Sequence, residues 1–172
     1  MRVISIGRNQ GLLDRLTKAL REAGHDAVGT NQLDSPLLDA PYDVVAFGRA
    51  LTAEDRARLE QALRARNPGI VSFVGMSPEV GVLKGQVESV SAGADFAISG
   101  STVRFRLDSE TELRWKIRRV NLLYRASERV FHVATYPAGA HVLHVDGRHK
   151  LRLGSNFLQV EAGGRMIFTA PV

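Results

Sequence analysis

Strand-like and helix-like patterns alternate over the first 125 residues. Mostly apolar runs, typical of strands buried in a parallel sheet, lie at 3–6, 26–30, 42–47, 70–74 and 96–98. Apolar residues at helical spacing lie between and after them, at 12–23, 52–66, 78–90 and 109–124. This alternation predicts an α/β domain over residues 1–125, with a doubly wound parallel sheet of five strands covered on both faces.

Polar residues mark the starts of three of these helices. Thr52 with Asp55, and Ser109 with Glu112, have the spacing of a capping box. Ser77-Pro78 is a typical opening for the helix at 78–90. These signals predict that the last helix of the domain begins near residue 110 and continues to Tyr124.

After residue 126 the apolar period changes from 3.6 to 2. Strands are predicted at 130–135, 140–145, 148–153, 157–160 and 166–169. Asp146-Gly147 and Gly163-Gly164 have the composition of tight hairpin turns. The chain therefore predicts a small antiparallel β module over residues 126–172, which packs on the first domain or on a second copy.

The charge is concentrated in the second half of the chain. Residues 1–92 carry 11 basic and 11 acidic side chains, whereas residues 93–172 carry 12 basic and 7 acidic ones, which accounts for the net charge of +5. Such an excess indicates either a solvated basic face or an acidic partner, nucleic acid or protein.

The composition narrows the chemistry and the compartment. The chain has no cysteine, which excludes disulfides, thiolate metal sites and a cysteine nucleophile. No apolar run approaches the roughly 20 residues that span a bilayer, and the N-terminal residues do not resemble a signal peptide. We expect a cytoplasmic protein without a membrane contact.

Three segments resemble the response-regulator receiver family over about residues 1–125. They are GRNQGLLDRLTKALREAGHDAVGT, YDVVAFG and SAGADFAIS. The most specific piece is 92–96, which resembles the turn that leads into the fifth strand of receivers.

The positions that carry receiver chemistry are altered in this chain. Receivers hold Mg²⁺ with two acidic residues, phosphorylate an aspartate, and bind the phosphoryl oxygens with a hydroxyl and a lysine. The matching residues here are Gly7 and Arg8 for the acidic pair, Gly48 for the aspartate, Val74 or Gly75 for the hydroxyl and Ser99 for the lysine. The resemblance therefore implies a degenerate receiver that is not phosphorylated, has no catalytic residues and needs no cofactor.

The resemblance also implies an interaction face. Receivers commonly dimerise through the fourth helix, fifth strand and fifth helix, which correspond here to 80–90, 96–98 and 109–124. The residues singled out on the last helix are Trp115, Arg118, Arg119, Leu122 and Arg125. Packing against the β module is the alternative to a homodimer, and in both cases Trp115 is covered.

The tail supports a second hypothesis. VFHVATYPAGAHVLHVDGRHKLRL is similar to the β-platform that precedes the winged helix of one class of response regulators. That likeness implies a transcription regulator that contacts DNA through the basic C-terminal half. A recognition helix is not visible in the sequence, so this hypothesis ranks second.

The sequence contains two further candidate sites. Gly7 and Gly11 after the first strand resemble the phosphate turn of NAD(P)-binding folds, but Leu13 stands where the third glycine belongs. His144 and His149 face each other across the predicted hairpin and are weak zinc candidates, because no third ligand is evident. The preferred interpretation is a phosphorylation-independent regulatory protein that binds a protein partner or itself, with an NAD(P)-binding protein or oxidoreductase as the third hypothesis.

Overall fold

The computed structural model describes residues 1–145 and 154–172. It divides the chain into two compact units, Met1–Val87 and Glu88–Val172, and the division falls inside one helix, α3 (Val80–Ala92). The sequence placed this division at 125/126.

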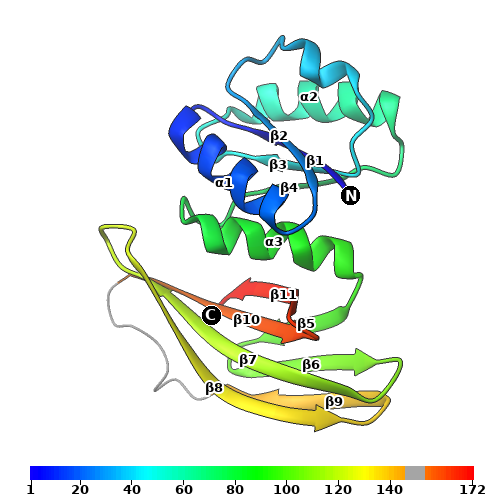
Figure 1. The fold of residues 1–172 in the computed structure, drawn as a ribbon, viewed down its shortest axis with the longest axis vertical. Helices are drawn as coiled ribbons and strands as arrows, with labels where there is room; N and C mark the ends of the chain where they lie inside the picture. The colour runs from blue at the N-terminus through cyan, green and yellow to red at the C-terminus, as the bar shows by residue number, and fades with distance from the viewer. Residues whose placement is uncertain (146–153) are drawn as a thin grey trace. The chain divides into compact units, whose positions relative to one another are not determined.

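The first unit contains a four-stranded parallel sheet. Its strands are β1 (Arg2–Ile6), β2 (Asp26–Thr30), β3 (Val44–Phe47) and β4 (Val71–Val74), in the order β2-β1-β3-β4. The other elements of this unit are α1 (Gln10–Glu22), α2 (Ala53–Arg66), the short 3-10 helix η1 (Pro36–Asp39) and the start of α3. Helices α1 and α2 lie on opposite sides of the sheet (Figure 1). The mixed α/β class is therefore confirmed.

Alternation along the strands builds the core of this unit. Ile4 and Ile6 of β1 pack with Phe47 of β3 against Leu59 and Leu63 of α2, and all five side chains are buried. The register pairs Ile6 with Phe47, so the apolar side chains line up across the sheet. Helix α2 begins as predicted, because the Thr52 hydroxyl accepts a hydrogen bond from the backbone N–H of Asp55 at 3.0 Å.

Helix α3 begins two residues later than predicted. The Ser77 hydroxyl accepts a hydrogen bond from the Glu79 N–H, and the Glu79 carboxylate in turn accepts from the N–H groups of Gly81 and Val82. A carboxylate at this position satisfies helix donors that have no backbone partner and also complements the helix dipole. Glu79 therefore caps the helix, and Ser77 orders the turn before it.

The expected fifth parallel strand is not confirmed. Residues 96–98 lie in β5 (Asp95–Ser99), which pairs antiparallel with β6 (Thr102–Leu107). A parallel connection needs a crossover of a dozen residues or more, but only two residues separate β5 from β6. Gly100 takes a φ of 59°, which allows this tight reversal. A third strand, β9 (Gly139–His144), completes this sheet in the order β5-β6-β9.

The predicted helix at 109–124 is wrong. Residues Thr111–Val120 form strand β7, which pairs antiparallel with β8 (Ala126–Tyr136). Leu113, Trp115 and Ile117 alternate along β7, and each is completely buried. Thr, Trp, Ile and Val are residues that favour strands, and the alternating pattern fits one buried face. The prediction that Trp115 is covered is confirmed, although on a strand.

The second unit is completed by a further antiparallel sheet. Strand β10 (Ser155–Ala162) lies between β7 and β11 (Arg165–Pro171), giving the order β11-β10-β7-β8. The predicted strands at 130–135, 157–160 and 166–169 fall within β8, β10 and β11, and β9 overlaps the one at 140–145. The expected strand at 148–153 and the Asp146-Gly147 turn lie outside the described residues. Phe96 stacks on Phe105 in the core of this unit, and Trp115 packs against both at a steep angle, with ring centroids 5.2–6.1 Å apart.

Candidate functional site

The carboxyl edge of the parallel sheet is where open α/β sheets bind ligands, between the strands at which the order reverses. In the order β2-β1-β3-β4 this position lies between β1 and β3. Gly7 and Gly48 follow these two strands, and the Gly48 N–H donates to the Ile6 carbonyl at 2.7 Å. A Cβ added to Gly48 would lie 3.1 Å from the Gly7 Cα. The two backbones are in contact, so this crevice is narrow.

Arg8 lies at the same edge and has an acidic partner. Its guanidinium lies 3.5 Å from the carboxylate of Asp55, in the first turn of α2. Asp55 also lies 3.8 Å from Arg58. The Asp55 carboxylate therefore lies between two arginines, and the position that matches a receiver's Mg²⁺ ligand is a cation.

The remaining receiver positions are divided between the two units. Val74 ends β4 at the carboxyl edge and is 38% exposed. The next residue, Gly75, is packed so closely that an added Cβ would lie 2.6 Å from Leu83 of α3. Ser99 belongs to β5 in the second unit. The structure thus brings Gly7, Arg8 and Gly48 together and places Ser99 on a different sheet.

In the turn at residues 7–13, which was the candidate for binding a dinucleotide, side chains make contacts within the protein. The Asn9 side chain caps α1 by accepting from the Leu12 N–H at 3.0 Å. Leu13, at the position of the third glycine, is 6% exposed and belongs to the core. Thr30 ends β2, where dinucleotide folds carry an acidic residue, and its hydroxyl is hydrogen-bonded to Gln32.

A groove of about 610 Å³ lies between α1, β2 and η1. Its lining mixes both signs of charge, with Asp14 and Glu22 beside Lys18 and Arg21. The floor is made by Gly29, where an added Cβ would lie 2.9 Å from the Thr17 hydroxyl. Helix α1 therefore lies unusually close to β2 at this point.

The β7–β8 hairpin carries a network of charged side chains that extends to β10. Lys116 of β7 is nearly buried, and its ammonium donates to Glu161 of β10 and lies 3.0 Å from Glu128 of β8. Glu128 also accepts from Arg118 at 3.0 Å. Burial lowers the pKa of Lys116, but the hydrogen bonds to Glu161 and Glu128 outweigh it, and the net pKa is raised.

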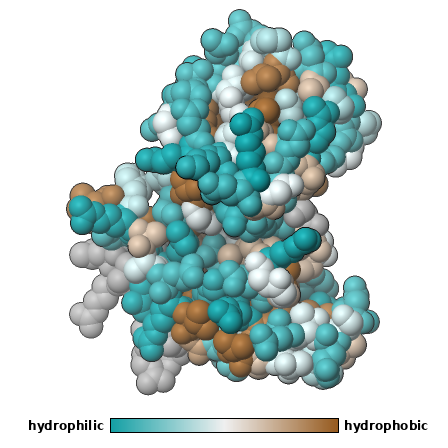
Figure 2. Space-filling model, viewed as in Figure 1, coloured by the Kyte–Doolittle hydropathy of each residue, from teal (hydrophilic) through white to brown (hydrophobic). Residues whose placement is uncertain are grey.

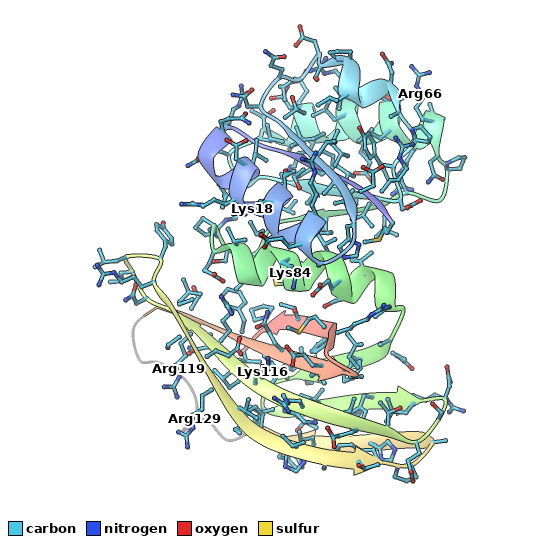
Figure 3. All side chains as sticks on the ribbon, viewed as in Figure 1. Lys18, Arg66, Lys84, Lys116, Arg119 and Arg129 are labelled. Atoms are coloured by element: carbon cyan, nitrogen blue, oxygen red, sulfur yellow. The ribbon has the colours of Figure 1, made fainter. Side chains whose placement is uncertain are left out.

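The residues that were expected to form an interaction face on the last helix lie on the β7–β8 hairpin instead. Trp115 points into the core, and Arg118 is partly covered in its pair with Glu128. Arg119, Leu122 and Arg125 lie at the distal end, on the last strand residues and the connecting turn. In Figure 3, Arg119 and Arg129 project from neighbouring strands of the hairpin.

The turn that joins β7 to β8 is strongly apolar. Leu122, Leu123 and Tyr124 are 73%, 75% and 63% exposed. Figure 2 shows a brown patch at the left edge of the molecule, where Figure 1 draws this turn, with hydrophilic residues beside it. The turn was missed from the sequence because it was assigned to a helix. The signal that would have found it is an Asn followed by three apolar residues and an Arg.

The histidines do not converge on a metal site in the described part of the chain. His144 is hydrogen-bonded to the Thr102 hydroxyl at 3.1 Å, His132 to the Tyr136 hydroxyl at 2.9 Å, and His141 lies 2.8 Å from the Pro137 carbonyl. His149 lies outside the described residues. Among residues 1–145 and 154–172 no three His, Cys, Asp or Glu side chains are grouped as metal ligands.

Comparison with known proteins does not place this chain in a family. No protein-family model and no curated protein matches the chain. An NAD kinase from Archaeoglobus fulgidus, solved in complex with ATP, is similar over 99% of this chain and 84% of its own, with 14% identity and a TM-score of 0.37. An alkylpurine DNA glycosylase from Pseudomonas fluorescens, bound to DNA with an abasic site analogue, is similar over 69% of this chain and 38% of its own, with 10% identity and a TM-score of 0.24. Likenesses of this size carry no argument about function. No helix in the described part of the chain is both long and apolar enough to cross a bilayer.

Proposed function

We propose that this chain is a receiver-like regulatory protein that acts by binding a protein partner or a second copy of itself, without phosphorylation or catalysis. The observation that carries the proposal is the carboxyl edge of the parallel sheet, where Gly7 and Gly48 are in contact beside Arg8. Phosphoryl transfer to an aspartate needs a nucleophilic carboxylate and further carboxylates for Mg²⁺ at this edge. Two glycines and an arginine supply neither.

The strand order supports the receiver-like part of the proposal. The sheet order β2-β1-β3-β4 equals the first four strands of the flavodoxin-like order 2-1-3-4-5, to which receivers belong. The strand that would come fifth pairs with β6 instead. The proposal is therefore a receiver scaffold whose last strand and helix are replaced by antiparallel structure.

The test is treatment of the full chain with Mg²⁺ and either acetyl phosphate or beryllofluoride, with a phosphorylatable receiver in parallel as the control. We expect an unchanged intact mass and an unchanged thermal midpoint, whereas the control gains one phosphoryl group. A stoichiometric phosphoryl adduct on this chain would refute the proposal. A rise of the midpoint with NADPH alone would instead support the dinucleotide hypothesis.

Self-association is tested separately by sedimentation at several protein concentrations. A concentration-dependent dimer supports the homodimer that the receiver resemblance implies. A monomer throughout overturns self-association and leaves a different protein as the partner.

DNA binding stays the second candidate because the β7–β8 hairpin is basic. From Thr111 to Tyr136 the chain has six Lys or Arg and two Glu residues. Binding to duplex DNA would weaken steeply with salt, since each neutralised phosphate releases counterions. A mobility-shift assay at two salt concentrations tests this, and a lack of binding at the lower one would exclude it.

A further inference from the structure

The turn between β7 and β8 is held by a defined set of hydrogen bonds. The side-chain oxygen of Asn121 accepts from the N–H groups of Leu123 and Arg125, at 2.9 and 3.0 Å. The backbone closes the turn with bonds from Asn121 N–H to the Arg125 carbonyl and from Tyr124 N–H to the Asn121 carbonyl. Tyr124 takes a left-handed φ of 57°, which is unfavourable for a residue other than glycine. The turn is therefore built to present its side chains in one arrangement.

What the turn presents is three consecutive apolar side chains. Leu122, Leu123 and Tyr124 are the most exposed large apolar residues that the structure describes, and Val142 on β9 follows at 57%. An isolated exposed apolar residue is ordinary, but three in a row at the end of a hairpin form a patch that marks an interaction surface. Leucine side chains offer no hydrogen bonds, so transfer of this patch from water to an apolar environment is favourable.

Cations surround this patch. Arg119 precedes it on β7, Arg125 follows it directly, and Arg129 lies four residues further along β8. At a strand rise of about 3.4 Å per residue, Arg129 lies roughly 14 Å along the strand from Arg125. Within the hairpin, the acidic residue that follows the turn along β8 is Glu128, which accepts from Arg118 and Lys116. The distal hairpin therefore has an apolar tip and a basic collar.

This arrangement matches the layers of an anionic membrane surface. Interfacial anchors bury their apolar groups about 5–10 Å into the boundary between headgroups and acyl chains, while Lys and Arg stay among the headgroups. Tyr is favoured at this boundary, and each cation near an anionic leaflet adds attraction. Two hairpins meeting tip to tip would instead bring two clusters of arginines together, which opposes a dimer through this turn.

We propose that the β7–β8 turn binds the surface of an anionic lipid bilayer, with Leu122, Leu123 and Tyr124 inserted and with Arg119, Arg125 and Arg129 on the lipid phosphates. No spanning segment is needed for such a contact. The expectation of no membrane contact, drawn from the lack of a spanning run and of a signal peptide, did not consider contact through an exposed turn. This binding site is independent of the phosphorylation-free regulation proposed above.

The test is co-sedimentation of the full chain with vesicles of phosphatidylcholine, with and without 30 mol% phosphatidylserine. The first variant is Leu122→Ser with Leu123→Ser, and the second replaces Arg119, Arg125 and Arg129 by Gln. The matched control is Val142→Ser, which removes an exposed apolar side chain from a different sheet. Thermal midpoints of all variants show that each is folded.

We expect binding to the anionic vesicles only, with partitioning lowered at least about tenfold by the double Ser variant and by the triple Gln variant, and unchanged by Val142→Ser. Absence of binding to anionic vesicles overturns the proposal. Loss with the Gln variant but not with the Ser variant also overturns it, because that result means adsorption by charge alone. If the chain does not bind vesicles, two further results would give the turn another role. Binding to a 30-base-pair DNA duplex that the double Ser variant abolishes would make it a DNA contact. A dimer that the double Ser variant abolishes would make it a dimer contact.

Discussion

Lys116 offers the sharpest test of how the second unit is stabilised. Its side chain is 11% exposed, and its two carboxylate partners, Glu161 and Glu128, are 20% and 37% exposed. At an effective dielectric constant near 20, a charge pair about 3 Å apart attracts by roughly 5 kcal/mol before desolvation is subtracted. Removing one partner of a fully buried pair costs roughly 3–5 kcal/mol, because the other charge is left uncompensated.

Because this network is only partly buried, we expect a smaller cost. Lys116→Met should lower the free energy of unfolding by about 2–3 kcal/mol, since it leaves Glu161 and Glu128 facing each other with Arg118 as the remaining partner. Glu161→Gln should cost about 1 kcal/mol, because Glu128 still pairs with Lys116. The double variant should cost less than the sum, with a coupling of about 1 kcal/mol.

Urea unfolding followed by tryptophan fluorescence measures these changes. Trp115 is the single tryptophan of the chain and lies next to Lys116 on β7, so the signal reports on the second unit. The raised pKa of Lys116 adds a pH signature. A group whose pKa is higher in the folded state stabilises fully below its unfolded pKa of about 10.4 and loses this contribution as the pH rises through the folded value.

The cost of Lys116→Met should therefore be constant from neutral pH to about pH 10 and shrink above it. If Lys116→Met is as stable as the natural chain at pH 7, the network contributes nothing and the reasoning is wrong. A cost that stays the same above the folded pKa would show that packing of the lysine stem, and not its charge, is responsible.

Four further substitutions have defined outcomes. Gly48→Ala should lower the free energy of unfolding by about 1–2 kcal/mol, because its Cβ would lie only 3.1 Å from the Gly7 Cα. Gly11→Ala should raise it by about 0.5–1 kcal/mol, because its Cβ meets only a side-chain oxygen at 3.6 Å. Thermal unfolding compares the two variants. The hydrogen bond from the Ser72 hydroxyl is the main cause of the lowered pKa of Glu60. The loss of unfolding free energy in Glu60→Gln should therefore be present at pH 7 and disappear as the pH falls through the lowered pKa of the folded state. Chemical unfolding at pH 7 and at acidic pH measures this difference. Tyr124→Gly should raise stability by about 1 kcal/mol by relieving a left-handed backbone, and an unchanged or lower midpoint would contradict that strain.

The elements of the first unit were predictable because each carries one clear period. The apolar runs of β1 and β3 have no competing helical pattern, and Thr52 with Asp55 marks the start of α2. The positions of Gly7, Arg8 and Gly48 at the sheet edge were also predictable, since these residues follow directly from where the strands end. Their mutual contact required the structure.

Strand β7 was not predictable because its residues satisfy two periods. Leu113, Ile117, Val120 and Tyr124 recur at helical spacing, whereas Leu113, Trp115 and Ile117 alternate. The choice is made by pairing with β8 and β10, and β10 lies some forty residues away along the chain. Local propensity cannot resolve such a case, and the exposed turn at Leu122 was hidden by the same ambiguity.

The close approach of α1 to β2 constrains which sequences this scaffold tolerates. A Cβ at residue 29 would lie 2.9 Å from the Thr17 hydroxyl and 3.2 Å from the Leu13 Cβ, so either the Thr17 side chain must rotate or the helix must shift if residue 29 alone grows. Shortening Thr17 in the same molecule removes the closer of these two contacts, so exchange of Gly29 for Ala then costs less, although Leu13 must still give way slightly. Residues 17 and 29 should therefore vary as a pair among sequences that share this arrangement, although twelve positions separate them.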